Sequence, residues 1–203
     1  MENLSAENSL RLIAETIERS RKSIAKNSGK PLILWGCLVT ITAIIIWALW
    51  SCTGSPQWNL LWFAMTVIGG IGTYFMVRNN EKVPETEVSR ILGRIWLWFG
   101  IFSIGMFLLV LIVAVVCTAF DIPAHIHFNS GPIIMVLLGL CGTISGVVMK
   151  MKAVTISSVI STAVCLVLTS LIPEGDPANI LVFAILGIVI LIIPGILLQK
   201  KSR

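Results

Sequence analysis

Hydrophobic residues along this chain fall into six long stretches that contain no charged side chain. The stretches cover residues 31–50, 60–77, 95–120, 132–149, 153–172 and 179–199. Each has about 18 residues or more, which is the length that a helix needs to cross about 30 Å of hydrocarbon. Because the backbone in lipid must satisfy its own hydrogen bonds, such stretches form helices. The pattern therefore predicts six transmembrane helices.

Composition narrows the class of protein further. The 203 residues are 56% hydrophobic and only 12% charged, with a mean hydropathy of +0.94. A soluble domain has about 25% charged residues, so this composition excludes a disordered chain, a coiled coil and an ordinary soluble enzyme. We predict an all-α fold, a polytopic bundle of six transmembrane helices. Residues 1–30 are expected to form a cytoplasmic amphipathic helix and residues 31–203 the transmembrane domain.

Basic residues indicate how the predicted helices are oriented. Alternate connections, at residues 51–59, 121–131 and 173–178, contain no lysine or arginine. All fifteen basic residues lie in the other segments. The positive-inside rule therefore predicts that both termini are cytoplasmic. Trp47, Trp50 and Trp58 flank the first outer connection, where amphipathic rings prefer the level of the headgroups.

The N-terminal segment carries a narrow apolar stripe at helical spacing. Its residues are Leu10, Ile13, Ile17 and Ile24, with charged residues on the other faces. Residues 27–29 and Pro31 are of types that end helices, so we expect this helix to stop before the first span. This apolar stripe must be shielded from water by contact with another surface. The alternatives are the chain's own spans, the headgroup layer of the lipid bilayer, a cytoplasmic protein partner, or a second copy in a homo-oligomer.

Small residues gather on three predicted spans. They are Gly69 and Gly72 on the second, Gly139, Gly142 and Gly146 on the fourth, and Ser158, Thr162 and Thr169 on the fifth. Such residues let helices approach closely, so we predict helix contacts or, as the alternative, a polar path along the fifth span. The Ile- and Leu-rich first and sixth spans are expected to face lipid. Pro194, followed by Gly195, is expected to kink the sixth span.

The predicted spans contain no Asp, Glu, Lys, Arg or His. Ion-coupled transporters, proton pumps and intramembrane hydrolases need such groups at depth, so the sequence argues against these classes. A pore for a neutral solute needs no charge. The chain also lacks the glycine-rich phosphate loop and the hydrolase motifs, so we expect neither catalysis nor a cofactor. Acidic residues interleave with the N-terminal cations, which argues against binding of nucleic acid.

The outer connections hold weak candidates for chemistry. Asp121, His125 and His127 are of the types that bind a divalent metal, although a solvated polar loop is the simpler interpretation. Cys52 and Cys117 both lie near the predicted outer face, where a disulfide between them is geometrically conceivable. The sequence alone leaves the pairing of these two cysteines open.

A resemblance to known proteins rests on three parts of the sequence. They are residues 7–13 (ENSLRLI), the basic segment after them and residues 34–36 (LWG). The chain resembles uncharacterised small bacterial inner-membrane proteins in which an N-terminal amphipathic cytoplasmic helix precedes several membrane spans. The resemblance implies a bacterial inner-membrane location and assigns a role to no residue.

The missing intramembrane charge and the amphipathic N-terminal segment favour a non-enzymatic regulatory, sensory or accessory subunit that acts through helix association. The alternative is a small transporter or channel for neutral or lipophilic solutes, which would use the Ser and Thr residues of the fifth span. A third hypothesis is an enzyme that acts on lipid at the outer surface through His125, His127 and Asp121.

Overall fold

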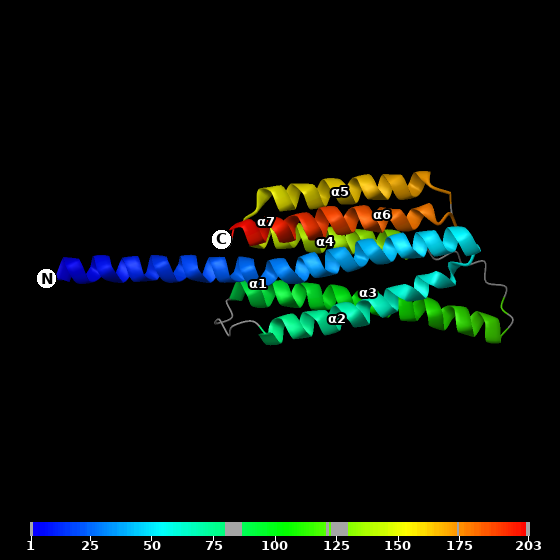
Figure 1. The fold of residues 1–203 in the computed structure, drawn as a ribbon, viewed down its shortest axis with the longest axis horizontal. Coiled ribbons are helices and arrows are strands. Elements are labelled where there is room, and N and C mark those ends of the chain that lie inside the picture. Colours follow the sequence, from blue (N-terminus) through cyan, green and yellow to red (C-terminus); the bar gives the residue numbers. More distant parts are fainter. Residues whose placement is uncertain (1, 80–86, 121, 123–129, 174, 202–203) are drawn as a thin grey trace.

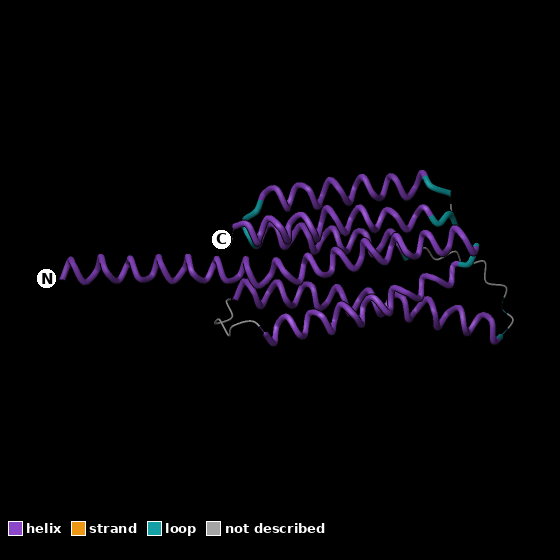
Figure 2. The backbone as a smooth tube through the Cα atoms, viewed as in Figure 1, coloured by secondary structure: helices purple, strands orange, loops and turns teal. Residues whose placement is uncertain are grey.

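The computed structural model of the chain describes every residue except 1, 80–86, 121, 123–129, 174 and 202–203. Every secondary-structure element in this described part is helical (Figure 2). The α-helices are α1 (Glu2–Thr53), α2 (Leu61–Asn79), α3 (Glu87–Ala119), α4 (Gly131–Val148), α5 (Lys152–Leu171), α6 (Ala178–Leu186) and α7 (Ile193–Lys201). A 3₁₀ helix (Pro56–Leu60) precedes α2, and a π-helical segment (Gly187–Ile192) joins α6 to α7.

Six stretches of the described residues are long and apolar enough to cross a membrane. They are Gly29–Thr53, Pro56–Arg78, Arg90–Ala119, Gly131–Val148, Lys152–Leu171 and Ala178–Lys200. Each overlaps one of the six uncharged stretches of the sequence. The prediction of an all-helical fold with six helices of this length and composition is therefore confirmed.

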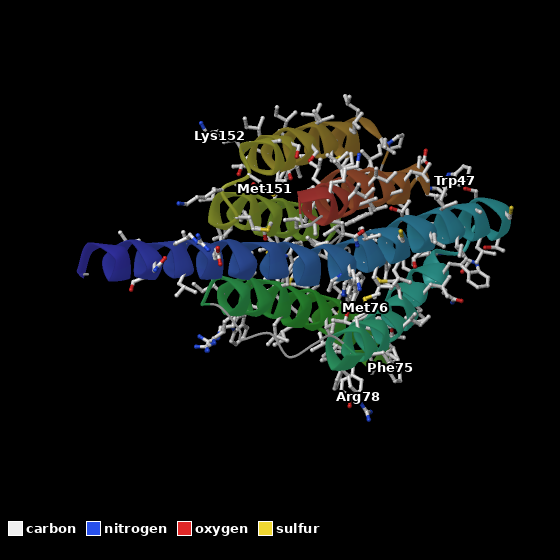
Figure 3. All side chains as sticks on the ribbon, turned by 60° about the vertical axis from the view of Figure 1, so that its left-hand side comes forward. Trp47, Phe75, Met76, Arg78, Met151 and Lys152 are labelled. Carbon is white, nitrogen blue, oxygen red and sulfur yellow. The ribbon has the colours of Figure 1, made fainter. Side chains whose placement is uncertain are left out.

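The helices alternate in direction, and α1 lies in the middle of the bundle (Figure 1). Helix α1 contacts α2 and α3 on one side and α6, the π-helical segment and α7 on the other, while α5 packs against α4 and α6. As a result, the ends that carry Arg78, Lys150 and Lys200 lie at the same end of the bundle as both termini. Arg78 and Lys152 point away from the helices there (Figure 3).

Helix α1 does not stop before the first apolar stretch, so the predicted break at residues 27–31 is wrong. The helix passes through Pro31 without a break. It has 52 residues in total, which corresponds to a length of about 78 Å. Proline removes one backbone hydrogen bond, and residues on both sides of it contact the last span. Gly29 lies against the backbone of Gly195, and Ile33 lies against Gly195 one turn later.

The part of α1 before Gly29 extends beyond the bundle (Figure 1). Its described side chains, at residues 8–12, 14 and 15, are all exposed, and Leu10 is 67% exposed. These residues therefore do not pack on the ends of the chain's own spans. The N-terminal helix is continuous with the central helix of the bundle.

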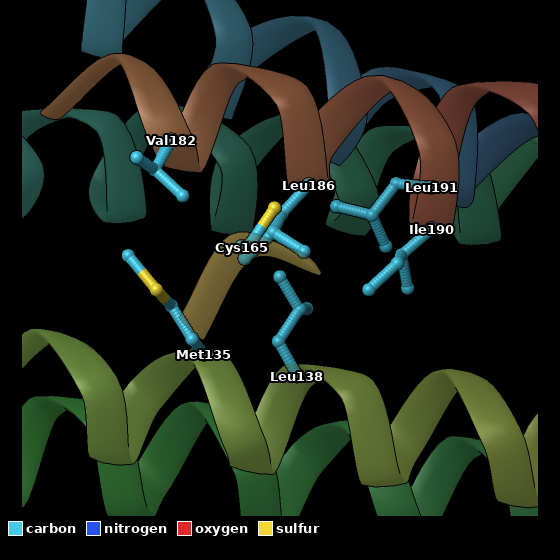
Figure 4. Packing of buried hydrophobic residues seen from close by; sticks show 7 residues of the cluster. All are labelled: Met135, Leu138, Cys165, Val182, Leu186, Ile190 and Leu191. Atoms are coloured by element: carbon cyan, nitrogen blue, oxygen red, sulfur yellow. The ribbon is translucent and has the colours of Figure 1, made fainter. Parts of the chain in front are cut away.

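Two clusters of buried side chains form the core. One joins α4, α5, α6 and the π-helical segment, through Met135, Leu138, Cys165, Val182, Leu186, Ile190 and Leu191 (Figure 4). The other joins α1, α2 and α6, through Ala43, Ile46, Trp62, Met65, Ile180 and Ala184. The last span contributes to both clusters and the first span to one. The expectation that these two spans face lipid is therefore wrong for their buried sides, while their other sides, with Ile41 and Ile188 for example, are exposed.

Helix α3 takes the peripheral position instead. Within the most apolar 18-residue window of each span, 44% of the residues are buried in the last span but none in α3. Composition alone cannot distinguish a central helix from a peripheral one, because Ile and Leu side chains pack equally well against another helix and against a lipid chain. Large side chains on α3, such as Trp98 and Phe102, lie at the surface of the bundle.

The last span is distorted immediately before Pro194. The π-helical segment Gly187–Ile192 separates α6 from α7, and Pro194 itself is buried. Because proline has no N–H to donate to the carbonyl of Ile190 and its ring crowds that group, the backbone preceding it departs from α-helical hydrogen bonding. The kink predicted at Pro194 stays a prediction, and what the structure shows before this proline is a change of helical type.

Candidate functional site

The interface between α4 and α5 brings together small and hydroxyl-bearing residues. Three pairs meet there, Gly139 with Thr162, Gly142 with Ser158 and Gly146 with Thr155. A Cβ atom added to Gly146 would lie 2.6 Å from the backbone nitrogen of Thr155, and a backbone atom cannot rotate away. The two helices therefore touch almost backbone to backbone. Thr155 was not among the residues singled out in the sequence, although it continues the same face of α5 by one turn.

Most hydroxyl groups at this interface are satisfied within their own helix. Thr162 Oγ1 and Ser161 Oγ donate hydrogen bonds of 2.7 and 3.3 Å to the carbonyl oxygen of Ser158. Ser145 Oγ on α4 donates to the carbonyl of Cys141 at 2.7 Å. Thr169 Oγ1 contacts Met135 Sδ at 3.6 Å. Hydroxyls engaged in this way support helix packing and offer no row of free groups to a polar solute.

Ser158 is the exception, because its buried Oγ has no hydrogen-bond partner. We expect Ser158→Ala to leave the free energy of unfolding unchanged or to raise it by about 1 kcal/mol, since the variant removes an unsatisfied polar group. Ser161→Ala removes a buried hydroxyl that has a partner and should lower the same quantity by about 0.6–1 kcal/mol. Unfolding of the purified chain in mixed micelles measures both. A larger loss for Ser158→Ala than for Ser161→Ala would contradict this interpretation.

The predicted glycines of α2 lie against α1. A Cβ atom added to Gly69 would lie 2.7 Å from the ring of Trp35, and one added to Gly72 would lie 2.9 Å from a methyl carbon of Leu34. The indole Nε1 of Trp35 donates a 2.9 Å hydrogen bond to Thr73 Oγ1. Gly69 thus leaves space for the Trp35 ring, which is also hydrogen-bonded to α2. Trp35 therefore anchors α1 to α2.

Sequence reasoning missed a close contact between α1 and the last span. Gly29 and Gly36 of α1 face Gly195 and Gly187 of the last span. A Cβ atom on Gly29 would lie 2.9 Å from the carbonyl oxygen of Gly195, and one on Gly36 would lie 3.0 Å from that of Gly187. The sequence did contain a signal for this contact. Gly29 and Gly36 are seven residues apart and Gly187 and Gly195 are eight apart, and both spacings place the two glycines on one side of a helix.

A groove of about 550 Å³ lies between α3 and α4. Its lining is almost entirely apolar, and Arg94 is its one charged residue. No residue of α5 contributes to this groove, so it is not the polar path considered for the fifth span.

The N-terminal part of α1 is the other exposed candidate surface. Arg11 Nε and Glu15 Oε1 are 3.5 Å apart in an exposed ion pair of i,i+4 spacing. Leu10 lies on α1 with its side chain exposed. The backbone of Ile13, Ile17 and Ile24 is helical, and their side chains are outside the described part of the structure.

The candidates for metal chemistry cannot be placed. Asp121, His125 and His127 fall outside the described residues. Within the described ranges, no three His, Cys, Asp or Glu side chains come together as a metal site. The five cysteines are free thiols, including Cys52 and Cys117, so the structure contains no disulfide between these two.

Comparison with known proteins gives no further lead. No protein family, curated protein or solved structure matches this chain.

Proposed function

We propose that this chain is an integral membrane protein that crosses a bacterial inner membrane six times, with both termini in the cytoplasm. The six apolar helices and the alternation of their directions support the crossing. The gathering of Arg78, Lys150, Lys152 and Lys200 at the end that holds both termini supports the orientation, because loops rich in lysine and arginine stay in the cytoplasm.

We further propose that the protein is a non-enzymatic regulatory, sensory or accessory subunit that acts by helix association. The observation that carries this proposal is the unbroken helix α1, whose N-terminal part extends out of the bundle while its C-terminal part forms the centre of it. A partner that binds outside the membrane would thereby act directly on the helix that α2, α6 and α7 contact.

Geometry favours a protein partner over the membrane surface as the cover of the apolar stripe. If Gly29–Thr53 crosses the membrane, a straight helix holds the preceding residues away from the headgroups, and 27 residues extend about 40 Å. Leu10, Ile17 and Ile24 are each seven residues apart, which is the spacing of a seam between two helices. The occupant is a cytoplasmic helical protein or a second copy of this chain.

The alternative, a channel or transporter along the fifth span, has less support. The hydroxyl groups of α5 are largely bonded to their own helix, and its small face lies against α4. The groove between α3 and α4 lies elsewhere.

Photo-crosslinking in living cells tests the association. With a benzophenone amino acid at position 10 or 17 of the full chain, we expect a covalent adduct to one protein or to a second copy, because these positions share the stripe. Position 15 lies on the opposite side of the helix and serves as the control; its yield should be lower by at least about fivefold, the size expected when a contact worth about 1 kcal/mol is lost. Equal yields at positions 10 and 15, or no protein adduct at position 10, would contradict the proposal.

A further inference from the structure

The groove between α3 and α4 is an open slot with an apolar floor. Cys141 of α4 is buried at its floor, and Phe99 of α3 and Leu137 of α4 are half-buried beside it. Trp98 and Phe102 of α3 form the outer wall, with 67% and 48% of their surfaces exposed. A groove of about 550 Å³ that is lined by large apolar side chains and open along one side can hold an apolar ligand that stays partly in contact with lipid.

The part of the groove between Arg94 and Phe102 fits within one leaflet of a bilayer. Along α3 the lining extends from Ile91 to Phe102, and its part from Arg94 to Phe102 is about 12 Å long at 1.5 Å per residue. Half of a hydrocarbon core of about 30 Å is about 15 Å. The groove also begins at the end of α3 that adjoins the other cationic ends of the bundle, so it would open to the inner leaflet.

Arg94 places a charge one turn from the end of the groove that begins at Ile91. Since the lining is almost entirely apolar, Arg94 contributes its aliphatic stem, and the exposed residue carries its guanidinium beyond the slot. Arg94 is also the last charged residue before the uncharged stretch at 95–120. In a membrane its guanidinium would therefore lie at the level of the lipid phosphates, where a planar fork of donors binds a phosphate through two hydrogen bonds.

We propose that this groove is a specific site for one anionic phospholipid of the inner leaflet. An acyl chain occupies the slot between α3 and α4, and the headgroup phosphate binds Arg94. The proposal rests on the membrane insertion and orientation proposed above. It gives the protein a means to respond to lipid composition, because α3 contacts the bundle mainly through α4 and, more weakly, through α1.

A second copy of the chain fits the groove less well. In a symmetric dimer about an axis along the membrane normal, each residue lies at the same depth as its counterpart. Pairing of two α3 helices through this groove would bring the two Arg94 side chains to one level, where like charges repel each other. A phosphate of opposite charge removes this conflict.

The test uses the full chain in vesicles that contain phosphatidylcholine, phosphatidylglycerol and a trace of phosphatidylglycerol with a diazirine in its acyl chain. After illumination, we expect the label on residues 91–102 and 137–141. Unlabelled phosphatidylglycerol should compete for this label at least about tenfold better than phosphatidylcholine, the ratio that corresponds to about 1.4 kcal/mol. Arg94→Gln should reduce the label about fivefold or more, while Arg78→Gln, an exposed cation outside the groove, should not change it.

A second variant tests the slot itself. Leu137→Trp adds bulk beside the floor of the groove and should lower the label while Arg94 stays intact. Equal competition by the two lipids, a label unchanged in Arg94→Gln and Leu137→Trp, or a crosslink between two copies at position 98 would overturn the lipid site. Flotation of the chain with the vesicles is measured on the same samples. A chain that floats without the site-specific label overturns only the lipid site, whereas a chain that does not float overturns the membrane insertion as well.

Discussion

Gly36→Val is expected to lower the midpoint of thermal unfolding of the detergent-solubilised chain by roughly 6–12 °C, the shift that about 3 kcal/mol produces in a chain of this size. A Cβ atom at this position would lie 2.6 Å from Ile192 Cγ1, 2.9 Å from Leu191 Cβ and 3.0 Å from the carbonyl oxygen of Gly187. The side chain of Ile192 can rotate, whereas the other two atoms are fixed to the backbone. The substitution must therefore move α1 away from the last span.

That separation would weaken more than one contact. Helix α1 lies in the middle of the bundle, and α6 belongs to both buried clusters. Gly100→Val on α3 is the matched control, because nothing lies within 4 Å of the added Cβ and the change in helix propensity is the same. Intrinsic tryptophan fluorescence during heating measures both midpoints. If the two variants melt together, the close approach of α1 and the last span is incorrect.

The number and approximate extent of the six apolar spans followed from sequence because they depend on local properties. An uncharged run of about 20 residues must satisfy its own backbone in lipid whatever its neighbours are. The partners of each helix depend on contacts between residues far apart, such as Gly36 with Gly187. The sequence contains both glycines but gives no rule that joins them, so α1 and the last span were assigned to lipid.

Helix boundaries were less predictable for a related reason. Proline at position 31 and glycine at position 29 are individually unfavourable within a helix, with costs of about 3 and 1 kcal/mol. In the bundle, Gly29 lies against Gly195, where any larger residue would clash. The glycine that was expected to end the helix therefore forms a contact between helices. Local preference gave the wrong result because packing against a distant segment outweighed it.

Most of the small residues chosen as packing candidates lie at helix contacts, but the sequence left their role open. Ser158 and Thr162 suited a polar path and a packed interface equally well. The hydrogen bonds within α5 and the three glycines opposite it favour the packed interface. The groove beside Arg94 could not have been predicted, because it depends on how α3 and α4 are spaced.

Cysteine labelling is expected to distinguish the two ends of the bundle completely. In a chain whose other cysteines are alanine, Cys52 should react with a membrane-impermeant maleimide in intact bacterial cells with an accessible outer face of the inner membrane. Cys52 is exposed and lies at the end opposite to both termini. In a chain that also carries Cys52→Ala, Lys150→Cys should react only after the membrane is permeabilised, because the turn at Lys150 is exposed at the cationic end.

Denatured samples of both chains control for intrinsic reactivity, and labelling of position 150 before permeabilisation would contradict the proposed orientation. The helix contacts would be unaffected by such a result, because Gly36, Gly187 and the buried clusters pack in the same way whichever end faces the cytoplasm. Arg94 and the exposed part of α1 would instead lie at the outer face. The orientation in the membrane therefore determines which lipids and proteins can reach the Arg94 groove and the exposed part of α1. The fold determines only that these two surfaces lie at the same end of the bundle.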